Sequence, residues 1–477
     1  MPASALVAPP RPVPGPRPLP LLGSRLDLLR FFADPIRHLL ALSELGSVAA
    51  MSAGNDTLVF AFGAAHNHTV LSDPSTFRNA VEVPFPLPPG SAATRIFRGV
   101  MSMNGEEHRR HRRLLLPVLT KAAVARYSSD IVELSDRQVE QWARAPSFDL
   151  GPACGELTSA VLMRCLFDTE GRGEGERMAA AGGRLLSLFT SPFTIALPWR
   201  LPGSPYARFI DTCEEVERDM RQMVATRGAQ EAEGRDVMSI LLRARDEDQV
   251  GLGEDQVIAH LISMVFAGQD TIASTLAVTL LLLTQFPDQA HALKEELDAV
   301  LGGAPPSPED LARLPLLDGV VNESMRLLPA IVHLLFKRPD APIQLGEHRL
   351  PAGATIILSP LITHRDPAVF PDPLGFDPLR WQGPAPGPYA WMPFGAGPRT
   401  CVGASLSSYI LRVQLAMILQ RFRPELVAGT RVDLMVRAAN LLFRGPVPVR
   451  LRPWAGARAR GGVERLDGDV RRLVRLG

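Results

Sequence analysis

The feature that most constrains this chain is a glycine-rich loop around one cysteine. Residues 391–403 read WMPFGAGPRTCVG. Glycines let a backbone approach a flat partner closely and adopt positive φ. A cysteine just before a helix is favoured as the thiolate by the helix dipole, and Arg399 adds a cation close to Cys401. The loop therefore predicts a thiolate that faces a ligand; the alternative is a buried structural cysteine.

The composition excludes several classes of protein. The chain has 477 residues, 46% of them hydrophobic, and a net charge of +1, so we expect no nucleic-acid partner. Its four cysteines have no zinc-ligand spacing and are too few for a disulfide framework, which indicates a reducing compartment. We find no secretory signal and expect a cytoplasmic protein.

One long apolar stretch, residues 257–286, approaches the length of a membrane span. It contains His260, Gln269 and Asp270, and a charge near a helix centre is costly in lipid. We therefore expect a long buried helix and no membrane anchor.

Hydrophobic periodicity predicts a mainly α fold with a smaller β region (α+β). We expect a Pro-rich segment, a main domain and an Arg-rich, flexible or weakly helical extension, at residues 1–20, 21–453 and 454–477. Within the main domain we expect a loop at 81–100, two helices in 308–328, a hairpin over 345–360 with its turn at 351–353, coil at 364–400 and a final helix at 404–422.

The cysteine loop resembles the haem-ligand loop of the cytochrome P-450 family. The matching pattern is Phe-x-x-Gly-x-Arg-x-Cys-x-Gly, met by Phe394, Gly397, Arg399, Cys401 and Gly403. The resemblance implies haem b, with Cys401 as the axial thiolate ligand of iron, between a long central helix and the helix after the loop. It also implies that Phe394 and Gly395 lie against the haem and that Arg399 pairs with a propionate.

Two further motifs follow the order of the same family. On the apolar stretch, residues 267–271 read AGQDT and resemble the oxygen-activation signature. Gly268 would leave room for a ligand, and Thr271 can bond back to the carbonyl four residues earlier. Thr271 and Asp270 would then relay protons to bound dioxygen.

Next, Glu323 and Arg326 share a helix face and resemble the structural pair of the family, with Arg380 as third partner. The alternative for this pair is a surface contact of little energetic value. If the triad is buried, it would hold the fold around the cysteine loop.

Upstream, residues 105–112 resemble the helix that reaches the haem propionates. His108 and Arg112 lie four residues apart and are assigned to the propionates. The remaining arginines of this run, Arg109, Arg110 and Arg113, are expected on a solvated basic face that could dock an acidic electron donor.

The sequence departs from the family at one position. Many relatives have a propionate-binding arginine ten residues after the ExxR arginine, where this chain has Phe336. Lys337 and Arg338 follow directly, and the sequence leaves open whether either replaces that arginine.

The resemblance implies a monooxygenase that inserts one oxygen atom from dioxygen into an apolar, lipid-like, terpenoid or polyketide substrate. Electrons would come from NAD(P)H through a separate ferredoxin and ferredoxin reductase, and the chain would be a monomer. The alternatives are desaturation, ring coupling or peroxide-driven oxidation at the same haem, or a non-catalytic haem sensor or carrier. The predicted substrate contacts are Phe85, Phe97, Phe189, Phe193, Val332 and Leu334.

Overall fold

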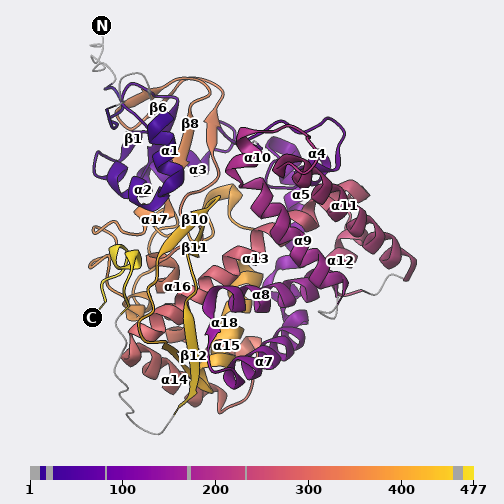
Figure 1. The fold of residues 1–477 in the computed structure, drawn as a ribbon, viewed down its shortest axis with the longest axis vertical. Helices are drawn as coiled ribbons and strands as arrows, with labels where there is room; N and C mark the ends of the chain where they lie inside the picture. The colour runs from indigo at the N-terminus through magenta and orange to yellow at the C-terminus, as the bar shows by residue number, and fades with distance from the viewer. Residues whose placement is uncertain are drawn as a thin grey trace. The chain divides into compact units, whose positions relative to one another are not determined.

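The computed structural model describes residues 11–17, 25–80, 83–168, 173–230, 234–454 and 466–476. The chain forms two compact units, each built from separate stretches of sequence (Figure 1). Unit 1 comprises residues 1–81, 332–373 and 386–400, and unit 2 comprises residues 82–331, 374–385 and 401–477.

Unit 1 is the smaller, β-rich unit. Its helices are α1 (Arg25–Ala33), α2 (Pro35–Ser43), α3 (Ala64–Ser72) and α17 (Pro360–Thr363), with a 3-10 turn η4 (Gly397–Arg399). Its strands are β1 (Val48–Ala50), β2 (Leu58–Ala61), β3 (Phe77–Asn79), β5 (Lys337–Pro339), β6 (Ile343–Leu345), β7 (His348–Leu350) and β8 (Thr355–Leu358).

Five of these strands form one sheet in the order β1-β2-β8-β5-β3, in which only β2 and β8 are parallel. Alternate side chains of β1, β2 and β8 enter one apolar core together with Val70, Phe77 and Met392. The predicted hairpin is wrong in its pairing. β6 pairs with β7 around Gly346, and β8 leaves β7 for the main sheet because its β-branched residues pair with β2 instead.

Unit 2 is helical. Its helices are α4 (Ala92–Ile96), α5 (Gly105–Leu115), α6 (Lys121–Val124), α7 (Ser128–Arg144), α8 (Leu150–Phe167), α9 (Glu174–Phe189), α10 (Pro192–Ala196), α11 (Pro205–Gln230), α12 (Val237–Arg243), α13 (Glu254–Gln285), α14 (Pro287–Leu301), α15 (Pro308–Leu311), α16 (Pro315–Leu327) and α18 (Ala404–Leu419). The 3-10 turns are η1 (Leu116–Leu119), η2 (Ala125–Tyr127), η3 (Pro378–Gln382) and η5 (Asp469–Arg472).

Two small antiparallel sheets complete unit 2. One has the order β4-β12-β9 and the other is the hairpin β10-β11. The strands are β4 (Phe148–Asp149), β9 (Phe422–Leu426), β10 (Leu434–Arg437), β11 (Asn440–Phe443) and β12 (Pro448–Pro453). The α+β fold class expected from periodicity is confirmed. The described part of the predicted loop at 81–100 contains the short helix α4, which Ser91 caps by accepting a hydrogen bond from the Thr94 N–H.

The long apolar stretch forms α13 (Figure 1). In the described part of the chain it is the one helix long and apolar enough to span a membrane, but 67% of its most apolar window is buried within the protein. Gln256 caps its start by accepting a hydrogen bond from the Gly253 N–H, at 3.0 Å. Burial accounts for the apolar composition of α13, as a core helix requires.

Of the extension expected to be flexible or weakly helical, residues 466–476 include the 3-10 turn η5 and pack against the rest of unit 2; residues 455–465 lie outside the described part. Leu466, Val470, Leu473 and Val474 are buried, and the Val432 N–H donates to the Asp467 carbonyl at 2.8 Å. Gly468 lies at φ +115°, where an added Cβ would be 2.1 Å from the Val432 carbonyl. Apolar side chains among the arginines therefore anchor this segment, which the Arg-rich composition of the tail does not indicate.

This anchoring predicts that Leu473→Ala lowers the free energy of unfolding by about 2–4 kcal/mol, because it leaves a cavity at a fully buried site. Denaturant unfolding of the purified protein measures the change. Arg471→Ala, at an exposed position two residues earlier, is the control and should change stability by less than about 0.5 kcal/mol. Equal midpoints for the two variants would show that the tail does not contribute.

Candidate functional site

The cysteine loop is shaped by two glycines with left-handed backbone in unit 1. Gly395 lies at φ +71° and Gly397 at φ +70°. A Cβ on Gly397 would be 2.4 Å from the Leu71 carbonyl at the end of α3, so only glycine permits this approach. Thr400 closes the 3-10 turn by donating to the Gly397 carbonyl at 2.7 Å. Sequence and packing together dictate the path of the backbone into Cys401.

Cys401 differs from the other cysteines because its side chain reaches solvent. Cys154, Cys165 and Cys213 are buried, and burial raises the pKa of each thiol far above its usual range. Burial within dense surroundings also raises the pKa of Cys401, against the effects of the Gly403 N–H, which donates to its sulfur, and of the Arg112 charge. The Gly403 N–H and the Arg112 charge are the two features at this sulfur that favour the thiolate.

Helix α5 places the two predicted propionate residues on one face. His108 is buried, and Arg112 is partly buried, so that desolvation lowers its pKa. Within the described residues no carboxylate pairs with Arg112, and the charge that acts on it is that of Cys401. A partly buried guanidinium without an acidic partner fits an anionic group of a ligand.

The rest of the basic run is not a free basic face. Arg110 donates to Asp246 at 2.7 Å and to the carbonyls of Val250 and Gly251. Arg109 pairs with Glu106 at 2.6 Å, and both side chains are exposed. Sequence reading missed the Arg110 contact because Asp246 lies 136 residues away. The expected solvent exposure is therefore found for Arg109 and Arg113. It is wrong for Arg110, which is only partly exposed and bonded to Asp246.

Two buried histidines join α5 to α13, and sequence reading did not single them out. The Val100 N–H donates to His260 Nδ1 at 3.2 Å, so the neutral ring carries its proton on Nε2 and donates to His111 Nδ1 at 2.8 Å. Burial lowers the pKa of His260 to about 3 and also lowers that of His111. The pair therefore stays uncharged at neutral pH and fixes α5, which carries His108 and Arg112.

The predicted triad is a buried cluster around the carboxylate of Glu323. Glu323 and Arg326 are fully buried and meet through two hydrogen bonds of 2.8 and 2.9 Å. Arg380 Nε and Trp381 Nε1 each donate to Glu323 at 3.0 Å. Gly319 lets this segment reach α16, since a Cβ there would be 2.4 Å from the Pro378 carbonyl. Trp381 is a member that the sequence analysis missed.

The predicted oxygen-activation motif, residues 267–271, lies where the burial of α13 changes. Residues 272–284 are buried, whereas Ala267 is exposed in the middle of the helix. Thr271 Oγ1 donates to the Ala267 carbonyl at 2.7 Å, the hydrogen bond expected from sequence. The interpretation of Gly268 is wrong on one point: the side that lacks a Cβ faces Leu162 of α8 at 3.0 Å, so this glycine serves helix packing there.

Asp270 has a partner that sequence could not reveal. Its Oδ2 accepts a hydrogen bond from Arg437 Nη2 at 2.7 Å, from the end of β10. Among the described residues, no hydrogen bond joins Asp270 to Thr271. The two groups expected to act together therefore have separate partners in this state.

The two cations after Phe336, Lys337 and Arg338, make different contacts in unit 1. Lys337 is buried and its Nζ donates to Asn79 Oδ1 at 2.5 Å. Burial and the positive charge of Arg399 lower the pKa of Lys337 to about 8. Arg338, on the opposite face of β5, donates to Thr355 Oγ1 at 3.0 Å. Lys337 is thus the cation that shares the surroundings of Arg399.

Aromatic side chains gather within unit 2 between α4, α9, α11 and α13. Phe97 stacks on Phe189 with ring centroids 5.2 Å apart, and Phe85 meets Phe209 at 5.0 Å. Phe266 lies 6.4 Å from Phe97. Phe193, in contrast, is 68% exposed and lies outside this cluster. Three of the predicted substrate contacts therefore share one apolar environment.

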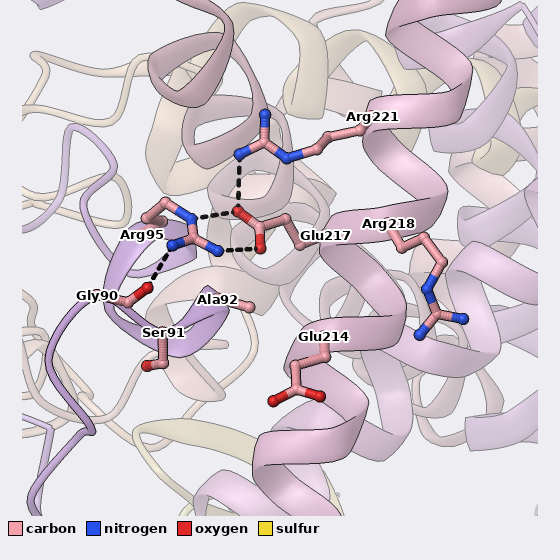
Figure 2. Close-up of a pocket in the computed structure, with 8 residues that line it drawn as sticks. All are labelled: Gly90, Ser91, Ala92, Arg95, Glu214, Glu217, Arg218 and Arg221. Atoms are coloured by element: carbon pink, nitrogen blue, oxygen red, sulfur yellow. Dashed lines mark hydrogen bonds and ion pairs between the residues drawn. The ribbon is translucent and has the colours of Figure 1, made fainter.

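An ion-pair network fixes α4, which leads into Phe97, against α11. Figure 2 shows Arg95 facing Glu217, to which it donates twice at 2.6 Å. Arg221 also donates to Glu217, at 3.0 Å. An open pocket of about 440 Å³ lies beside this network. The bidentate geometry gives α4 a defined position above the aromatic cluster.

The comparisons with known proteins identify the family and the fold. The family model for cytochrome P-450 matches residues 13–451. Cyclooctat-9-en-7-ol 5-monooxygenase of Streptomyces melanosporofaciens is 28% identical over 92% of this chain and 94% of its own length. Putative cytochrome P-450 135B1 of Mycobacterium tuberculosis is 30% identical over 68% of this chain and 67% of its own length. The structure of cyanobacterial CYP120A1 with retinoic acid bound has the same fold, with a TM-score of 0.81, 23% identity and coverage of 93% of this chain and 99% of that one.

The buried cluster predicts that Glu323→Gln destabilises the fold by about 3–5 kcal/mol, because the neutral amide leaves the Arg326 charge uncompensated. Denaturant unfolding measures this change. If Glu323→Gln does not fold, the milder Arg380→Lys variant, at a side chain that is 14% exposed, tests the same cluster. Glu309→Gln, at an exposed position of α15, is the matched control. Equal stability of Glu323→Gln and Glu309→Gln would contradict the assigned role.

Proposed function

The chain belongs to the cytochrome P-450 family, and we propose that Cys401 ligates a haem with which this monooxygenase oxidises a largely apolar organic substrate. The observation that carries the proposal is the accessible Cys401 sulfur, which accepts the Gly403 N–H and lies within the electrostatic reach of Arg112. When bound, haem b supplies oxygen activation, because a thiolate ligand increases electron density at iron and favours O–O cleavage.

We assign the anionic edge of the haem to the basic residues that the sequence motifs single out. In unit 2, Arg112 and His108 on α5 would bind a propionate. From the loop motif, Arg399 would bind a propionate, and Phe394 and Gly395 would lie against the ring. Lys337 is a better candidate than Arg338 to replace the missing arginine, because it is buried beside Arg399 while Arg338 is turned to Thr355.

We assign proton transfer to Thr271 and Asp270. The Thr271 hydroxyl donates to the Ala267 carbonyl, so its oxygen can still accept a proton or a hydrogen bond from water. The exposed face of α13 at Ala267 gives water access to this turn. Asp270 would supply the proton that Thr271 passes on.

The aromatic cluster supports a substrate that is mostly hydrocarbon. Phe97, Phe189 and Phe209 offer apolar rings. The relative cyclooctat-9-en-7-ol 5-monooxygenase is named for a substrate that is an unsaturated cyclic alcohol. We therefore propose a terpenoid-like or lipid-like substrate with few polar groups, positioned by rings on α4, α9 and α11.

We propose that electrons come from NAD(P)H through a ferredoxin and its reductase, and that the enzyme acts as a cytoplasmic monomer. Arg109 and Arg113 are exposed and support docking of an acidic donor, whereas Arg110 is engaged with Asp246. Charge reversal at Arg109 and Arg113 that leaves the rate of electron transfer unchanged would refute this docking face.

The test of haem ligation is the absorption spectrum of the dithionite-reduced protein under carbon monoxide. We expect the red-shifted Soret band of a thiolate-ligated haem, and its loss in Cys401→Ala. Cys213→Ala, at a buried cysteine of α11, should retain the band. A parent spectrum with the band at the shorter wavelength typical of histidine-ligated haem would refute thiolate ligation.

A second test separates oxygen use from peroxide use. Thr271→Ala should raise the hydrogen peroxide released per NAD(P)H several-fold, since the proton path is interrupted. Thr275→Ala removes a hydroxyl with the same backbone bond one turn later, in a buried position, and should leave the ratio unchanged. An enzyme that uses peroxide as its oxidant would show no difference between Thr271→Ala and the parent.

A further inference from the structure

One buried histidine lies directly against the start of the cysteine loop, and the sequence analysis did not single it out. His364 is fully buried at the end of α17 in unit 1. Its Nε2 accepts a hydrogen bond from the Met392 N–H at 3.0 Å. The ring also lies against Trp391, with ring centroids 4.7 Å apart. His364 therefore contacts the first two residues of the segment 391–403.

This hydrogen bond fixes the protonation state of the ring. A backbone N–H can donate only to a ring nitrogen that carries no proton, so the ring of His364 is neutral, with its proton on Nδ1. Met392 is also fully buried, in the apolar core of unit 1. An N–H at such a position is destabilising without an acceptor, because solvent cannot replace one. The Nε2 atom of His364 supplies the acceptor that is needed there.

The segment that presents His364 is joined to the same loop by a second contact. Asn67 of α3 is fully buried and donates through Nδ2 to Thr363 Oγ1 at 3.1 Å, one residue before His364. The same Nδ2 donates to the Tyr389 carbonyl at 2.9 Å. The start of the loop is thus fastened to the end of α17 directly at Met392 and through Asn67 at Tyr389.

The turn that follows Met392 is built on the same residue. The Met392 carbonyl accepts a hydrogen bond from the Gly395 N–H at 3.1 Å, and Gly395 has the left-handed φ of +71°. Both polar backbone groups of Met392 are therefore engaged, the N–H by His364 and the carbonyl by Gly395. A shift at Met392 would be carried into the loop that leads to Cys401.

We propose that His364 is a positioning residue whose unprotonated Nε2 holds the start of the cysteine loop, and with it the path of the backbone toward Cys401. It acts through the Met392 backbone and not on the reacting atoms. A side chain that merely filled the space would leave the Met392 N–H without this acceptor. The inference rests on the proposed function, in which Cys401 ligates the haem.

A pair of amide variants separates the acceptor from burial. His364→Gln places an oxygen where Nε2 lies and should keep the hydrogen bond, whereas the side chain of His364→Asn is too short to reach the Met392 N–H. We expect His364→Asn to speed amide hydrogen exchange at residues 391–395 about tenfold, and His364→Gln to stay within about twofold of the parent. Strand β2 should exchange alike in all three proteins. Equal exchange in the two variants, or loss of protection throughout unit 1, would overturn the proposal.

A measurement on the parent covers the case in which His364→Asn does not fold. Nitrogen NMR of the parent with labelled histidine should show His364 as a neutral ring protonated at Nδ1, its signal assigned by its loss in His364→Gln. A ring that is protonated at Nε2 at neutral pH, whether neutral or charged, would contradict the assigned role.

The spectroscopic readout is the absorption spectrum of the reduced protein under carbon monoxide. In His364→Asn the share of protein with the red-shifted Soret band should fall to about half or less, because the loop that carries the ligand is no longer held. His364→Gln should restore the parent share. His291→Asn, at an exposed histidine of α14, is the control and should match the parent. A parent-like share in His364→Asn would sink the proposal.

The two proposals fail in distinguishable ways. If the proposed function is wrong, the parent gives no red-shifted band, while the difference in exchange between His364→Asn and His364→Gln persists. If the positioning role is wrong, the parent gives the band and the two variants behave alike.

Discussion

The carboxylate of Glu323 is the constraint on which the arrangement of unit 2 depends. A buried charge is tolerated only when donors surround it, so residues 377–381 must lie against α16. Gly319 makes that approach possible, and the Leu374 carbonyl just before the segment accepts the N–H of Arg475 from the tail. One carboxylate thereby organises a helix, an irregular segment and the end of the chain.

Helix α13 combines two environments along one axis. Its later half, residues 272–284, is buried and serves the core, while the turn around Ala267 is open. Thr271 stands at the boundary, where its hydroxyl satisfies the Ala267 carbonyl that solvent would otherwise reach. The contacts along the helix differ accordingly: a buried hydrogen bond joins Thr279 to Thr275, and a part-buried ion pair joins Asp270 to Arg437.

The sequence predicted those parts of the site that depend on short spacing. Glu323 and Arg326 meet because residues three apart share a helix face, and Thr271 reaches Ala267 for the same geometric reason. The contacts it missed join distant segments: His111 with His260, Arg110 with Asp246, and Asp270 with Arg437. No local pattern encodes such pairs, because each partner is an ordinary polar residue within its own segment.

The same limit explains the error in the β region, and it also applies to the surroundings of Cys401. The pattern of β8 predicts a strand but not its partner, since a β-branched run pairs equally well with a neighbour in sequence or with β2. For Cys401, the nearby cation and the helix start argue for thiolate, but the surrounding protein, invisible in the sequence, favours the neutral thiol.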